Sequence, residues 1–153
     1  MALLSGEYDE PQMLGLAMQL ARQLRAGDCL TFYGDLGAGK TTFIRGMIHV
    51  LCGLETVPSP TFTLVQTYDS SVAPIWHFDL YRLKTPDELY ELGFEEALSG
   101  GILFIEWPEH AKDLLPSSQL QLHLESAQSD LKRKITISGD ALWAARLTPL
   151  NQH

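Results

Sequence analysis

The chain has 153 residues, of which 45% are hydrophobic and 20% are charged, and its formal net charge is −8 at pH 7. This length suits one domain with one core and is too short for two ordinary domains, so we expect residues 1–153 to form a single domain. The negative charge argues against autonomous binding of RNA or DNA, because nucleic-acid binders usually present a basic surface to the phosphates.

The sequence predicts neither a membrane span nor an export signal. No apolar run approaches the roughly 20 residues that cross a bilayer. The first ten residues lack a basic region followed by a long apolar stretch. We therefore expect a cytoplasmic protein without membrane association.

The first third of the chain predicts a helix, a strand, a glycine-rich loop and a second helix. Residues 10–25 place apolar side chains at helical spacing, and residues 29–33 form a short β-prone run that stops at Gly34. Apolar residues recur at helical spacing again from residue 40 to about residue 51. A buried strand that leads through a glycine loop into a helix is the order that a P-loop requires.

The middle of the chain predicts three strands. Residues 61–68 and 75–81 are β-prone, and the turn-forming segment between them favours an antiparallel hairpin. Residues 102–105 are continuously apolar, which is typical of a central strand covered on both faces.

Helices and strands complete the predicted domain. Residues 85–88, with Thr85 as N-cap, indicate the start of a helix or helix pair that runs to about Leu98 with a break near Gly93. The last third predicts two strands and a short final helix, at residues 120–125, 132–138 and 141–147. Together these elements predict a three-layer α/β domain of the P-loop NTPase type, with a mostly parallel sheet extended by an antiparallel hairpin and by C-terminal strands.

A complete phosphate-binding motif lies between the first strand and its helix. Residues 34–41 read GDLGAGKT and satisfy G-x-x-x-x-G-K-[ST], in which glycines let backbone amides approach phosphate oxygens. Lys40 is expected to reach the β- and γ-phosphates and Thr41 to bind Mg²⁺ through its hydroxyl, so the motif predicts ATP and Mg²⁺ as ligands. The expected nucleotide-binding residues are Gly34, Asp35, Leu36, Gly37, Ala38, Gly39, Lys40, Thr41 and Thr42.

Two carboxylates are candidates for the metal and the attacking water. Glu106 follows the most apolar strand, at the strand end where α/β sheets place their ligand sites. Asp79 shares one strand face with His77 by alternation. We expect Glu106 to join Thr41 at the metal, and Lys40, Glu106 and Asp79 to act in catalysis. The alternatives are a solvated strand end for Glu106, a salt-bridged acid for Asp79 and a hydrogen-bonded core histidine for His77.

Two further features are ambiguous from the sequence. The hydroxyl-rich segment 59–63, SPTFT, could sense a γ-phosphate as switch loops do, or could be an ordinary rigid connection. Trp107 could simply pack, or could exclude water and report on a bound nucleotide.

The motifs GDLGAGKTTF, SPTFTLV, HFDLYRL, ELGFEE and IEWPE follow one another over about residues 28–109. With them the chain resembles the TsaE family, small bacterial ATPases of tRNA threonylcarbamoyladenosine biosynthesis. The resemblance implies that residues 37–42 hold the ATP phosphates, that Glu106 is the second metal-site residue beside Thr41, that Asp79 acts near the γ-phosphate, and that the 59–63 loop responds to the nucleotide.

The same resemblance implies a cellular role. Members of the family are weak Mg²⁺-dependent ATPases that act with the proteins TsaB and TsaD, and the threonylcarbamoyl group is moved onto an adenosine beside the anticodon. Contact with tRNA is then indirect, through the complex. Met13 stands where the family often has a threonine that faces the adenine, so the base contacts stay open, as does the choice between an adenine contact and a solvated strand end for Lys132 and Arg133.

Two other function classes compete with this interpretation. A small-metabolite kinase would share the P-loop but usually adds several arginines from a lid, and the arginines here do not cluster. A nucleotide-gated binding module with incidental hydrolysis would share all the parts of a weak ATPase. GTP is disfavoured because no N-K-x-D or T-K-x-D segment is present.

Overall fold

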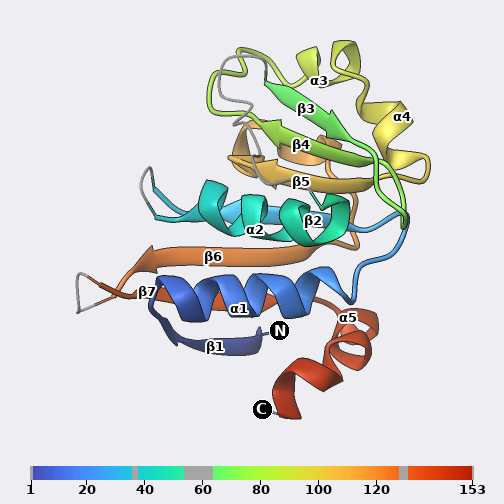
Figure 1. Cartoon of the computed structure of the whole chain (residues 1–153). Helices are drawn as coiled ribbons and strands as arrows, with labels where there is room; N and C mark the ends of the chain where they lie inside the picture. Colours follow the sequence, from blue (N-terminus) through green and yellow to red (C-terminus); the bar gives the residue numbers. More distant parts are fainter. Residues whose placement is uncertain (1, 36–37, 54–63, 128–130, 153) are drawn as a thin grey trace.

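The computed structural model describes residues 2–35, 38–53, 64–127 and 131–152, in which seven strands form one sheet (Figure 1). The strands are β1 Ala2–Tyr8, β2 Cys29–Tyr33, β3 Val65–Tyr68, β4 Ile75–Asp79, β5 Ile102–Glu106, β6 Leu120–Ser126 and β7 Arg133–Ser138. The α-helices are α1 Glu10–Ala21, α2 Lys40–Cys52, α3 Glu88–Glu91, α4 Phe94–Leu98 and α5 Ala141–Arg146. Short 3-10 helices are η1 Pro108–His110, η2 Lys112–Leu114 and η3 Thr148–Gln152.

The sheet has a parallel centre and antiparallel flanks. Its order is β1-β7-β6-β2-β5-β4-β3, and β6, β2, β5 and β4 are joined by parallel pairs. The flanking pairs β3–β4, β6–β7 and β1–β7 are antiparallel. The predicted α/β class, the hairpin of β3 and β4 and the C-terminal strands are confirmed, and the sheet as a whole is mixed.

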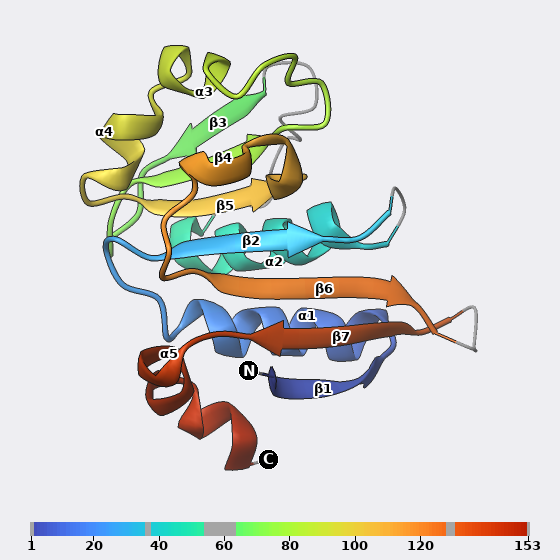
Figure 2. The same cartoon turned by 180° about the vertical axis from the view of Figure 1, so that it is seen from behind.

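Helices cover the sheet on two sides and give three layers. α1 and α2 lie together across one face, as Figure 1 shows, and α3, α4 and η1 pack on the other face over β4 and β5. On the α2 side the packed side chains include Phe32, Phe43, Ile44, Met47, Ile75 and Phe104. On the opposite side they include Phe78, Leu89, Phe94, Leu103 and Ile105. Seen from behind in Figure 2, β6 and β7 have no described helix over their central part, which matches the exposed His123 and Glu125 on that face.

Several predicted boundaries were wrong by a few residues. α1 ends at Ala21 instead of residue 25, because the chain turns there toward β2, and Gly27, at φ +93°, donates its N–H to Gly101 O at 2.8 Å. β4 ends at Asp79 instead of residue 81, because the next N–H groups turn to Glu106 O and to the Asp79 carboxylate.

Two features of the termini and turns escaped the sequence analysis. β1 was not predicted, because its side chains alternate only between exposed and half-buried on an edge strand. Thr85 was predicted as an N-cap, but the helix begins at Glu88, whose carboxylate accepts the N–H groups of Lys84 and Thr85 at 2.9 Å each. In the described ranges no helix has both the length and the apolar character needed to cross a membrane.

Candidate functional site: a cleft at the carboxyl ends of the parallel strands

A cleft of about 440 Å³ opens where the parallel strands end and α2 begins. The carboxyl ends of β4 and β5 meet the N-termini of α1 and α2 at this edge, which is where open α/β sheets place ligands. The lining residues are Tyr8, Asp9, Glu10, Met13, Gly39, Lys40, Thr41, Thr42, Asp79, Tyr81, Glu106, Trp107, Leu131 and Arg133.

The backbone of the phosphate loop requires glycine at both ends. Gly34 has φ +145°, and a Cβ added there would lie 2.3 Å from Leu124 O. Gly39 has φ +98° and is the N-cap residue of α2, so the first amides of that helix are exposed toward the cleft. Gly34, Asp35 and Ala38 line a separate hollow behind the loop instead of the cleft. The predicted residues Leu36 and Gly37 lie outside the described residues.

Lys40 is buried at the first turn of α2, with 4% of its surface exposed. Its ammonium group donates to Gly34 O and lies 3.7 Å from the centroid of the Trp107 ring, a cation–π contact. Burial lowers the pKa of this ammonium, and nearby carboxylates, Glu106 first, oppose that shift. The lysine side chain thus lies between the carbonyl of Gly34 and the Trp107 ring at the base of the loop.

Glu106 lies at the end of β5 between two hydrogen-bond donors. The Thr41 hydroxyl donates to its Oε1 at 2.9 Å, and His77 Nε2 lies 2.8 Å from its Oε2. Only 2% of Glu106 is exposed, which excludes the alternative of a solvated strand end. The predicted metal pair, Thr41 and Glu106, is thus in direct contact, although the two residues are 65 positions apart.

Asp79 stands beside Glu106 in the register of β4 and β5. The side chain is 7% exposed, lines the cleft and accepts the Tyr81 N–H at 3.1 Å. Burial raises the pKa of the Asp79 carboxyl, and the Tyr81 hydrogen bond partly opposes the shift. The structure therefore brings Lys40, Thr41, Glu106 and Asp79 into one cleft.

The pKa of Asp79 is higher in the folded chain than in the unfolded one, so ionisation of this carboxyl opposes folding. Its contribution to the stability of the folded chain is therefore most favourable below the unfolded pKa near 3.8, and it declines as the pH rises through the folded pKa. We expect Asp79→Asn, which can still accept the Tyr81 N–H, to raise the Tm at pH 7 by roughly 2–4 °C, the effect of about 1 kcal/mol in a domain of this size. Thermal unfolding of both proteins from pH 4 to pH 8 checks this. The gain should shrink toward acidic pH, and a gain that does not depend on pH would contradict the electrostatic origin.

Part of the cleft wall was not predicted. Tyr8, Asp9, Glu10 and Leu131 line it; Tyr8 ends the unpredicted strand β1, whereas Asp9 and Glu10 form the start of α1. A signal was present, since Asp9 and Gln12 form a capping box at the start of α1.

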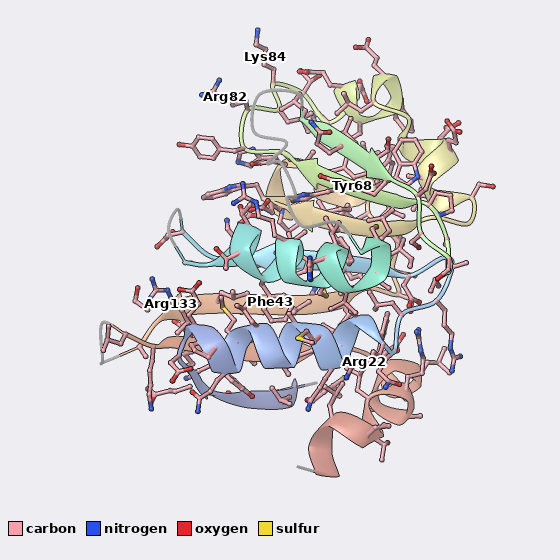
Figure 3. All side chains as sticks on the ribbon, viewed as in Figure 1. Arg22, Phe43, Tyr68, Arg82, Lys84 and Arg133 are labelled. Atoms are coloured by element: carbon pink, nitrogen blue, oxygen red, sulfur yellow. The ribbon has the colours of Figure 1, made fainter. Side chains whose placement is uncertain are left out.

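Two residues left open by the sequence line the same cleft, Met13 from α1 and Arg133 from the start of β7. In Figure 3 Arg133 lies at the end of the molecule where α2 begins, whereas Arg22 lies at the opposite end. Arg133 is therefore placed to contact a ligand in the cleft, and its role there stays a prediction. The predicted switch segment 59–63 lies outside the described residues.

The chain is similar to known proteins over most of its length. Residues 8–135 match the family model described as threonylcarbamoyl adenosine biosynthesis protein TsaE. The chain belongs to the TsaE family. TsaE proteins similar to it include that of Rickettsia conorii, 48% identical over 79% of this chain and 70% of the relative, and that of Bacillus subtilis, 40% identical over 80% and 77%.

A solved structure also resembles the fold. The crystal structure of Bacillus subtilis YdiB matches with a TM-score of 0.77 at 29% identity, covering 100% of this chain and 97% of that chain. The TsaE match includes the phosphate loop, both candidate carboxylates and the start of β7, so it spans nearly all of the cleft.

Proposed function

We propose that this chain binds and hydrolyses Mg-ATP in the cleft and thereby supports threonylcarbamoyl modification of the adenosine beside the anticodon of tRNA. The observation that carries the proposal is the meeting of Lys40, Thr41, Asp79 and Glu106 around the N-terminus of α2, directly after a complete phosphate-loop motif. Each element of a phosphate site is then supplied by this chain: backbone amides, a buried ammonium and oxygen donors.

The donor chemistry fits magnesium. Mg²⁺ prefers oxygen ligands and is usually held by one or two protein oxygens together with phosphates and water. The Thr41 hydroxyl and the Glu106 carboxylate are such oxygens and already lie 2.9 Å apart. These two residues would hold the ion, which neutralises charge on the phosphates. Asp79, beside Glu106 in the sheet, would orient water near the terminal phosphate.

The remainder of the cleft suits the nucleoside. A volume of about 440 Å³ lies within the range of small-ligand sites, roughly 300–1,000 Å³. Tyr8, Met13 and Arg133 line the part formed by β1, α1 and β7, and together they offer an aromatic ring, an adaptable thioether and a cation. These groups are suited to stacking on a purine base, so the adenine is placed there in this proposal.

The names of the relatives support the pathway, and the partners in this proposal are those that the family resemblance implies. The similar proteins are named for tRNA threonylcarbamoyladenosine biosynthesis. A net charge of −8 fits a subunit that contacts protein partners, TsaD and TsaB, and reaches tRNA only through their complex in the cytoplasm.

Calorimetry of the purified chain with ATP, ADP and GTP, with and without magnesium, tests the proposal. We expect heat of binding with ATP and ADP and a change in tryptophan fluorescence, because a phosphate that recruits Lys40 removes the ammonium from the Trp107 ring. Trp107→Phe should lose this fluorescence change, since neither Trp76 nor Trp143 lines the cleft. A folded protein that gives no heat with either adenine nucleotide at millimolar concentration would refute nucleotide binding.

A further inference from the structure

His77 is a buried histidine whose position the ATPase proposal leaves unexplained. It lies on β4 with 0% of its surface exposed, two residues before Asp79 on the same face of the strand. It does not line the cleft, so it has no direct route to a nucleotide. Any role in the chemistry must pass through a neighbouring side chain.

Among the residues that the structure describes, the imidazole makes its polar contact with Glu106. His77 Nε2 lies 2.8 Å from Glu106 Oε2, and the side chains of the pair are 0% and 3% exposed. Within the described residues, His77 Nδ1 is buried without a hydrogen-bond partner. Carboxylate oxygens accept hydrogen bonds, so the contact is a hydrogen bond when Nε2 carries the hydrogen and donates it to Oε2.

This arrangement has a cost that packing alone does not justify. A buried polar nitrogen without a partner destabilises the folded state, and an apolar side chain of similar size would avoid that cost. The neighbouring positions Ile75 and Phe104 show that the same face of the sheet accepts apolar residues. What an apolar residue could not do is hold Oε2 of Glu106.

We infer that His77 is a positioning residue that fixes the Glu106 carboxylate. Because His77 holds Oε2, the other oxygen, Oε1, is turned toward Thr41 at the mouth of α2. In the proposed function Thr41 Oγ1 binds the metal, and this inference rests on that proposed function. When Thr41 gives up its hydrogen bond, the His77 contact still orients Oε1 toward the same place. Without it, the carboxylate can rotate or repack, and the oxygen donors of the site lose their fixed orientation.

The test compares His77→Phe with His77→Gln. Phenylalanine keeps a ring of similar size and removes the donor, whereas glutamine carries an amide N–H at a reach close to that of Nε2. Loss of a residue that orients a metal ligand typically costs about 10–100-fold in affinity or activity, so we expect His77→Phe to lower kcat and to weaken ADP binding in magnesium at least about tenfold. Binding of ADP in EDTA, which does not involve the ion, should change less than about twofold, and His77→Gln should lie within about threefold of the wild type in all three measurements.

Calorimetry supplies the binding constants, a phosphate-release assay supplies kcat, and thermal unfolding monitors the fold. His123→Phe makes the same chemical change at an exposed position on the back of β6 and should match the wild type. If His77→Phe does not fold, the comparison of His77→Gln with His77→Asn tests the inference instead. Asparagine is one methylene too short to reach Oε2, so it should lose the effect that glutamine keeps. Equal kcat values and equal binding constants in these two variants would refute the inference. If folded His77→Phe has the wild-type kcat and the wild-type dependence of ADP binding on magnesium, His77 is an ordinary core histidine and the inference is wrong. A wild type that binds no nucleotide would instead refute the proposed function itself.

Discussion

Lys40→Ala is expected to lower kcat/KM for ATP hydrolysis by about 100-fold or more, the effect of removing one preorganised charge stabiliser from a buried site. The ammonium group of Lys40 lies at the base of the phosphate loop, where it contacts Gly34 O and the Trp107 ring. Backbone amides alone would still attract the phosphates, but without a mobile positive charge near the β- and γ-positions. Phosphate release under saturating and limiting ATP gives kcat and kcat/KM separately.

The fold should survive this change. The variant loses the hydrogen bond from Lys40 to Gly34 O, but it also avoids the cost of burying an ammonium group. Because these two effects oppose each other, we expect the Tm to stay within about 4 °C of the wild type. Lys40→Met keeps the aliphatic stem against Trp107 and removes only the charge, and it should lose as much activity as the alanine variant. Lys84→Ala removes an exposed lysine that does not line the cleft and that projects outward in Figure 3, so this variant should retain full activity. Normal turnover by folded Lys40→Ala would count against the whole site.

The phosphate loop was predictable because its requirements are local. A β-prone run, glycines at fixed spacing and a helix start are all read within about 25 consecutive residues, and the structure has β2, the loop and α2 in that order. Glu106 was also accessible, because a continuous apolar run predicts a buried strand and the ligand edge of an α/β sheet lies at its carboxyl end. The functional roles of these residues stay predictions.

What the sequence did not predict depends on contacts between distant segments. The order of strands places β6, from the last third of the chain, directly beside β2, and local patterns do not encode this neighbour. The pairing of Glu106 with His77 and Thr41 joins three elements and required the register of β4 against β5. β1 was missed because an edge strand with one half-buried face has a weak alternation, and with it the Tyr8 wall of the cleft was missed.

Glu106→Gln is expected to bind nucleotide and not to hydrolyse it. Glutamine has the shape of glutamate, and its amide can still pair with both the Thr41 hydroxyl and the His77 imidazole, so the local packing should persist. The variant lacks the negative charge of Glu106 that would hold the metal and activate water. We expect kcat to fall by about 100- to 10,000-fold, the range of general acid–base contributions, whereas nucleotide still binds, with an affinity in magnesium lowered by about 10–100-fold. Calorimetry and phosphate release measure the two effects.

The same variant separates an ATPase from a nucleotide-gated binding module. If hydrolysis drives turnover, Glu106→Gln should still be pulled down with TsaD and TsaB in ATP, while formation of modified tRNA by the reconstituted system falls with kcat. Glu109→Gln, an equal charge change at an exposed residue outside the cleft, should leave both assays unchanged. Unimpaired tRNA modification by Glu106→Gln would mean that binding of ATP is sufficient and that hydrolysis is incidental, because a switch needs only a difference in affinity between its two states.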